Sequence, residues 1–136
     1  MSEAIASLPV SSLVGDEIIT VTADTTIDAV ARLLEDAGIG IVAVGAPSVV
    51  DGVVSERDIV RLVANGGDPK TVTAGEVMTK ELVWCRDTST VPEVANEMFD
   101  RYVRHVLVAG DEGLVGIVSA RDILGVYASE DTDYGD

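Results

Sequence analysis

The sequence predicts an α+β fold made of two tandem repeats, each with a strand, a helix, two strands and a second helix. Three observations carry this prediction. The chain has 136 residues and is 47% hydrophobic, so it can bury a substantial core. Its apolar residues alternate between short runs typical of strands and a spacing typical of helices. In addition, a shift of 64 positions aligns residues 13–62 with residues 77–126 without a gap. Such self-similarity indicates that one structural unit occurs twice.

The two repeats share about a dozen identical positions, scattered through otherwise diverged sequence. They include the pairs Glu17/Glu81, Thr26/Thr90, Val30/Val94, Ala31/Ala95, Val42/Val106, Val44/Val108, Gly52/Gly116, Ser55/Ser119, Arg57/Arg121, Asp58/Asp122 and Ile59/Ile123. We place the first repeat at residues 10–67 and the second at 74–128, joined by a linker at 68–73. An N-terminal segment, 1–9, precedes them. An acidic tail, 129–136, follows and is expected to be disordered.

The elements of each repeat follow from local patterns. In the first repeat we expect a strand at Ile18–Val21 and a helix at Ile27–Ala37 that opens at Thr25 or Thr26. Strands at Ile41–Val44 and Val50–Val54 flank a turn, and a helix at Arg57–Ala64 ends at Asn65-Gly66-Gly67. The corresponding elements of the second repeat are Leu82–Cys85, Val91–Tyr102 behind a Thr90/Glu93 capping box, Val106–Val108, Leu114–Val118 and Arg121–Tyr127.

The last helix of each repeat begins with Ser-x-Arg-Asp, in VSERDIV from Val54 to Val60 and in VSARDIL from Val118 to Leu124. A serine followed three residues later by an aspartate forms a capping box, and a carboxylate in the first turn also suits the helix dipole. Capping explains each copy separately. It does not explain why both copies recur inside diverged repeats, so a duplicated binding motif is the alternative.

Composition limits the class of protein. The chain carries 24 acidic and 9 basic residues, a net charge of −15, which disfavours nucleic acid and anionic membranes as partners. This balance is typical of proteins from high-salt organisms such as halophilic archaea; an ordinary acidic cytoplasmic protein is the alternative. The absence of a long apolar run or a signal peptide pattern predicts a soluble cytoplasmic protein. A single cysteine, Cys85, excludes an internal disulfide, and with one histidine no Cys/His metal cluster can form.

Three motifs resemble those of the cystathionine β-synthase (CBS) domain family. They are the duplicated GVVSERDI and GIVSARDI at Gly52–Ile59 and Gly116–Ile123, the GEVMTKEL stretch at Gly75–Leu82, and VRHVLV at Val103–Val108. The resemblance covers about residues 8–128. It implies a paired module in which two repeats pack through their sheets about a pseudo-twofold axis, with the helices outside. The family binds AMP, ADP, ATP or S-adenosylmethionine in clefts between the repeats and commonly forms homodimers.

The resemblance also implies roles for individual residues. Asp58 and Asp122 would accept hydrogen bonds from ribose hydroxyls, and Ser55 and Ser119 would contact ribose or phosphate. The adjoining helix N-terminus would offer free N–H groups to a phosphate. Positions that flank the adenine in the family correspond to Ile19, Ile39, Gly40, Val83, Val103 and Arg104. An equal alternative is that these are simply the core ends of strands.

Phosphate needs cations, and the two copies differ in them. Arg104 and His105 stand where the family often has basic residues, whereas the first copy has Gly40 and Ile41. The second copy is therefore better equipped to hold a phosphate. Arg57 and Arg121 could serve both sites, although arginines in a first helical turn are more often solvated or salt-bridged.

We expect a regulatory module that senses an adenosine-containing ligand and acts on a protein partner in trans, with no required cofactor and no metal. The alternative is a ligand-independent dimeric scaffold. We do not expect an enzyme, because the sequence has no Walker-type phosphate loop and neither His105 nor Cys85 stands in the context of a nucleophile.

Overall fold

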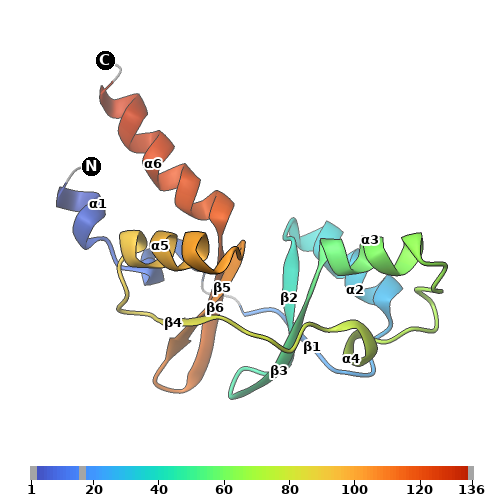
Figure 1. Cartoon of the computed structure of the whole chain (residues 1–136). Helices are drawn as coiled ribbons and strands as arrows, with labels where there is room; N and C mark the ends of the chain where they lie inside the picture. Colours follow the sequence, from blue (N-terminus) through green and yellow to red (C-terminus); the bar gives the residue numbers. More distant parts are fainter. Residues whose placement is uncertain (1–2, 16–17, 135–136) are drawn as a thin grey trace. The chain divides into compact units, whose positions relative to one another are not determined.

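The structure, a computed structural model, describes residues 3–15 and 18–134 (Figure 1). Residues 19–82 form one compact unit, and the parts of the chain before and after them together form the other. The elements are, in order, α1 (Glu3–Ser7), the 3-10 helix η1 (Val10–Leu13), β1 (Thr20–Val21), α2 (Ile27–Ala37), β2 (Ile41–Ala46), β3 (Val49–Ser55), α3 (Glu56–Ala64), α4 (Ala74–Val77), β4 (Trp84–Arg86), α5 (Val91–Arg101), β5 (His105–Gly110), β6 (Gly113–Ser119) and α6 (Ala120–Tyr134).

The unit of residues 19–82 contains a three-stranded sheet in the order β1-β2-β3. β1 runs parallel to β2, and β2 is antiparallel to β3. Helices α2 and α3 contact each other and pack against β2 and β3 respectively (Figure 1). The core between the helices and the sheet contains buried Val21, Ile27, Val30, Leu34, Val42, Val44, Val54 and Ala74.

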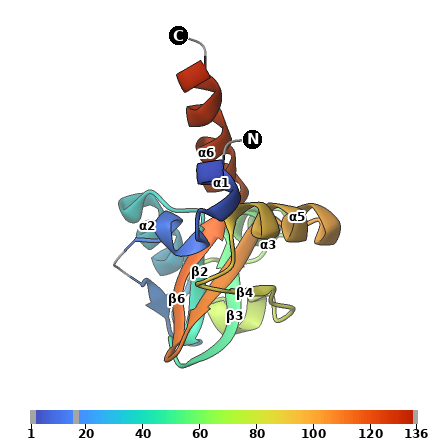
Figure 2. The ribbon, with the colours of Figure 1, turned by 90° about the vertical axis from the view of Figure 1, so that its left-hand side faces the viewer.

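The second unit repeats this arrangement with the sheet order β4-β5-β6, where β4 is parallel to β5 and β5 is antiparallel to β6. Helices α5 and α6 contact each other, α1 packs on α5, and α6 extends beyond the sheet (Figure 2). The buried core residues are Val10, Val91, Val94, Met98, Val106, Val108, Val118 and Ile123. Each unit is thus α+β with the predicted order of strand, helix, strand, strand and helix, which confirms the fold class.

A short segment at the start of each repeat packs in the unit that contains the rest of the other repeat. We call residues 8–14 and 72–79 the leading segments. In the unit of the first repeat, the Ile27 N–H donates to the Val72 carbonyl at 2.9 Å. In the other unit, the Val91 N–H donates to the Leu8 carbonyl at 2.8 Å. Because Leu8 and Val72 are 64 positions apart, each repeat contributes its leading segment to the unit of the other repeat.

Local differences from the sequence prediction have physical causes. The sequence did not predict α1, η1 or α4, which lie in or next to the leading segments and depend on contacts between residues far apart in the chain. β1 is shorter than expected, and β4 begins two residues and ends one residue later than expected. Helix α5 ends at Arg101 because Tyr102, its C-cap, adopts a left-handed conformation with φ 56°.

The expected disorder of the tail is wrong for residues 129–134, which continue α6 to Tyr134. No glycine or proline stands between Tyr127 and Gly135, so nothing in that stretch stops the helix. Residues 135 and 136 lie outside the described part of the chain. Within that part, no helix is both long enough and apolar enough to cross a membrane.

Candidate functional site

Ser55 and Asp58 form a complete capping box at the start of α3. The Ser55 N–H donates to Asp58 Oδ2 at 2.9 Å, and the Ser55 hydroxyl donates to the same oxygen at 3.1 Å. In return, the Asp58 N–H donates to Ser55 Oγ at 3.4 Å. Both residues are half-buried. The cap therefore fixes the Asp58 carboxylate at the end of β3.

Ser119 and Asp122 repeat this arrangement at the start of α6. The Ser119 N–H donates to Asp122 Oδ2 at 2.9 Å, and the Asp122 N–H donates to Ser119 Oγ at 3.1 Å. In both copies the cap uses only Oδ2. Among the described residues, Oδ1 of Asp58 and Oδ1 of Asp122 accept no hydrogen bond. Each carboxylate thus has one oxygen fixed by the protein and one oxygen left for another donor.

The backbone amides at these helix starts are largely occupied. The Glu56 N–H donates to the Gly40 carbonyl at 3.0 Å, and the Ala120 N–H donates to the Arg104 carbonyl at 2.8 Å. Since the third-residue amides are bonded to the cap serines, the expectation that the helix N-terminus offers a set of free N–H groups to a phosphate is largely wrong. An anion at this position depends mainly on side-chain cations.

Basic side chains gather at the second copy. Arg104 is exposed and precedes β5, and half-buried His105 pairs with Ser119 in the register of β5 and β6. Arg57 and Arg121, in the first turns of α3 and α6, are also exposed. Within the described residues, Arg57, Arg104 and Arg121 form no ion pair. Ion pairs elsewhere among the described residues join Arg32 to Asp28, Arg86 to Asp111 and Arg101 to Glu97.

The first copy carries an acidic group in the corresponding place, which the sequence analysis missed. A Cβ atom built on Gly40 would lie 3.2 Å from the Glu56 carboxylate oxygen Oε1. Aligning the repeats pairs Gly40 with Arg104 and Glu56 with Ala120, so the charge difference was visible in the sequence. The closeness of positions 40 and 56 was not visible, because only the folded backbone brings them together.

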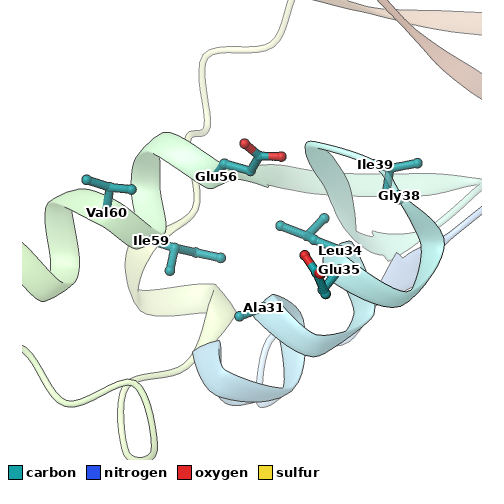
Figure 3. Close-up of a pocket in the computed structure, with 8 residues that line it drawn as sticks. All are labelled: Ala31, Leu34, Glu35, Gly38, Ile39, Glu56, Ile59 and Val60. Carbon is teal, nitrogen blue, oxygen red and sulfur yellow. The ribbon is translucent and has the colours of Figure 1, made fainter.

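The aliphatic residues expected to flank an adenine are partly buried and pack against the hydrophobic cores. Ile19 and Ile39 are half-buried against the core of residues 19–82, and Val83 and Val103 are half-buried against the other core. Ile39 also lines a pocket of about 500 Å³ between α2 and α3 (Figure 3). Glu56 borders this pocket, whereas Ser55 and Asp58 are not among its lining residues. The pocket is therefore not the predicted ribose site.

The Cys85 thiol and the Glu93 carboxylate have shifted pKa values with clear physical causes. Burial, and to a smaller extent the Asp87 carboxylate, raises the pKa of the Cys85 thiol to about 11, so the thiol is protonated at neutral pH. Hydrogen bonds from Thr90, through its backbone and then its side chain, lower the pKa of Glu93. Among the described residues, no group of three or more His, Cys, Asp or Glu side chains could hold a metal ion.

Comparison with known proteins identifies the family. The CBS domain model matches residues 10–65 and 74–129. An uncharacterized protein of Methanopyrus kandleri is 30% identical over 123 residues; the match covers 88% of this chain, which spans 63% of that relative's length. The crystal structure of the CBS-domain containing protein ATU1752 from Agrobacterium tumefaciens is similar with a TM-score of 0.78 and 33% identity, covering 88% of this chain and 98% of that one.

A second solved structure is that of the CBS domain pair of protein MJ0100, in complex with 5'-methylthioadenosine and S-adenosyl-L-methionine. Its TM-score is 0.77, and the likeness covers 88% of this chain and 98% of that chain. At 23% identity this likeness shows the fold. Two matched repeats, the same element order in both units and the duplicated Ser-x-Arg-Asp caps agree: the chain belongs to the CBS domain family and carries a tandem pair of CBS domains.

Proposed function

We propose that this chain is a regulatory module that binds an adenosine-containing small molecule and acts on a protein partner in trans. The observation that supports the proposal is the hydrogen bonding of the two aspartate carboxylates, Asp58 and Asp122. Oδ2 of Asp58 and Oδ2 of Asp122 are held by the helix caps, and Oδ1 of each has no partner among the described residues.

This arrangement suits a ribose. The 2' and 3' hydroxyls of a ribose form a pair of donors, and an ionised carboxylate oxygen accepts strongly from such groups. The cap lowers the cost of binding, because the carboxylate does not need to be ordered when the ligand arrives. MJ0100, a CBS domain pair, binds two adenosine compounds. For this chain the candidate ligands are AMP, ADP, ATP and S-adenosylmethionine.

Calorimetry and thermal denaturation with these four ligands test the proposal. Because the chain is strongly acidic, the experiments are run at about 0.15 M and about 1 M KCl. A ligand that binds only the native state should add about 2.7 kcal/mol of stability at a hundredfold excess over its dissociation constant. If none of the four ligands shows saturable binding at either salt concentration, the proposal fails.

A matched pair of variants separates ligand binding from helix capping. Asp122→Asn and Glu93→Gln each replace the carboxylate of a capping box, at the start of α6 and of α5 respectively. Only Asp122 belongs to the proposed ribose site. We expect Asp122→Asn to weaken ligand binding and Glu93→Gln to leave it unchanged, with similar small effects of both variants on stability.

A specific observation also supports the second function, a ligand-independent dimeric scaffold. Phe99 and Tyr102, three residues apart at the end of α5, are 80% and 94% exposed. Large exposed aromatic side chains are typical of protein interaction surfaces. Sedimentation of Phe99→Ala against the wild-type chain tests this function. Loss of self-association in the variant supports the scaffold, and a wild-type chain that is a strict monomer rejects it.

A further inference from the structure

We infer that the two CBS repeats select different classes of adenosine compound. The site at Ser119 and Asp122 admits a compound with a phosphate, such as a nucleotide, as well as one without a phosphate. The site at Ser55 and Asp58 takes a compound without one, either uncharged or positively charged at its 5' end. This inference rests on the proposed function and assigns ligand classes to its two sites.

The second copy presents positive charge around its aspartate. The hydrogen bond from the Ala120 N–H to the Arg104 carbonyl, 2.8 Å long, holds Arg104 beside the first residue of α6. Arg121 follows one residue later in the same helical turn as Asp122. Arg104 and Arg121 are exposed and form no ion pair with any described residue, so both guanidinium groups are available to an anion. With Asp122 they carry a local charge of +1.

The first copy uses the same backbone contact with opposite charge. Its equivalent bond, from the Glu56 N–H to the Gly40 carbonyl at 3.0 Å, places a residue without a side chain beside a glutamate. The Glu56 carboxylate lies 3.2 Å from the point at which a side chain at position 40 would begin. Figure 3 shows this carboxylate at the first turn of α3. Glu56, Arg57 and Asp58 together carry a charge of −1.

The charge difference between the two sites determines which of them binds a phosphate, because, among the described residues, few backbone N–H groups at either helix start are free to donate to one. At the starts of α3 and α6, the third-residue amides donate to Ser55 and Ser119, and the first-residue amides donate to the Gly40 and Arg104 carbonyls. A phosphate at either site is therefore held mainly by side-chain cations. At the first site the residue after the cap serine is Glu56, followed by Arg57 as the cation, whereas the second site has Arg121 in the same turn and Arg104 beside Ala120. A positively charged group, by contrast, would be attracted to Glu56.

Adenosine and AMP are the appropriate probes, because they differ only in the phosphate. We expect calorimetry on the full chain to give about two adenosine molecules and about one AMP molecule per chain, as direct consequences of one neutral-ligand site and one general site. Arg104→Ala should lower the affinity for AMP about tenfold to a hundredfold more than the affinity for adenosine. Arg61→Ala, which removes an exposed arginine of α3 outside both sites, is the matched control and should change neither affinity.

A reciprocal variant converts the first site. Gly40→Arg combined with Glu56→Ala gives the first copy the residues that the second copy has at these positions. This double variant should bind a second AMP molecule per chain. Circular dichroism checks that it is folded, and if it is not, Glu56→Ala alone should still raise the affinity of the first site for AMP.

The outcomes separate the inference from the function on which it rests. Equal losses of AMP and adenosine affinity in Arg104→Ala, or two equivalent AMP sites in the wild-type chain, overturn the charge selectivity and leave adenosine binding in place. If neither adenosine nor AMP binds, both the inference and the proposed function are rejected.

Discussion

Val14 lies directly over the backbone of Gly116, so closely that a Cβ atom added to the glycine would stand 2.7 Å from the Val14 Cβ. Val14 belongs to one leading segment and Gly116 to β6, in the motif that resembles the nucleotide-binding stretch of the family. The equivalent contact in the other unit joins Met78 to Gly52, where the added atom would lie 2.8 Å from the sulfur. The glycine of each motif is thus needed for packing.

Replacing Gly116 should destabilise the fold. The methyl group of Gly116→Ala overlaps Val14, and we expect a loss of about 1–3 kcal/mol in the free energy of unfolding. Gly125→Ala is the matched control, since Gly125 lies within α6 with nothing within 4 Å of an added Cβ. That variant should gain up to about 1 kcal/mol from helix propensity. Urea denaturation measures both, and a neutral Gly116→Ala contradicts the close packing.

The Thr90–Glu93 cap predicts a pH dependence of stability. The hydrogen bonds from Thr90 depress the pKa of Glu93 in the folded protein below its ordinary value of 4.5. The ionised carboxylate therefore contributes stability above pH 4.5, and this contribution is lost as the pH falls through the lowered folded pKa. We expect the stability difference between the wild type and Glu93→Gln to be full near neutral pH and to shrink below pH 4.5. A difference that grows on acidification would falsify this assignment.

Tyr102 should be replaceable by glycine with a gain in stability. Its backbone is left-handed, with φ 56°, and its side chain is 94% exposed. The equivalent residue of the first repeat, Gly38, has φ 67° and serves as the C-cap of α2. Because glycine adopts this conformation without strain, Tyr102→Gly should raise the free energy of unfolding by about 1 kcal/mol. A destabilised Tyr102→Gly variant would contradict the backbone strain assigned to Tyr102.

The two aspartates should contribute unequally to nucleotide binding. Asp58→Ala and Asp122→Ala each remove the carboxylate of the same type of cap, so the cost of the lost cap is similar in both variants. The cations available to a phosphate lie beside Asp122. We therefore expect Asp122→Ala to weaken AMP binding more than Asp58→Ala in calorimetry. Equal losses would rule out this asymmetry.

Cys85 should react slowly with alkylating reagents. Burial raises the pKa of its thiol from the ordinary 9.0 to about 11, and only the thiolate reacts. At pH 8 the folded protein should hold about a hundredfold less thiolate than the unfolded chain. Labelling with iodoacetamide should accordingly be much slower in the native state and should accelerate up to about pH 11. Equal native and denatured rates at pH 8 would contradict the raised pKa.

Local patterns in the sequence were sufficient to predict the two long helices and three strands of each repeat and the caps at Ser55, Thr90 and Ser119, although not the short helices η1 and α4. These features depend on residues three or four positions apart. The exchange of leading segments was not predictable in this way, because the contact between Leu8 and Val91 joins residues that are distant in sequence. Glu56 was missed for a different reason: its significance depends on its proximity to Gly40, which only the folded backbone establishes.

The exchange of leading segments determines where the chain can be cut to obtain a fragment that contains one complete unit. A cut in the linker between the repeats would separate Ile27 from Val72 and leave Leu8 with the wrong half. Residues 19–82 form one unit from a continuous stretch of chain, whereas the other unit is made of the residues before and after this stretch. A fragment for isolating one repeat should therefore run from Ile19 to Leu82, and its counterpart requires a new peptide bond between Ile18 and Val83.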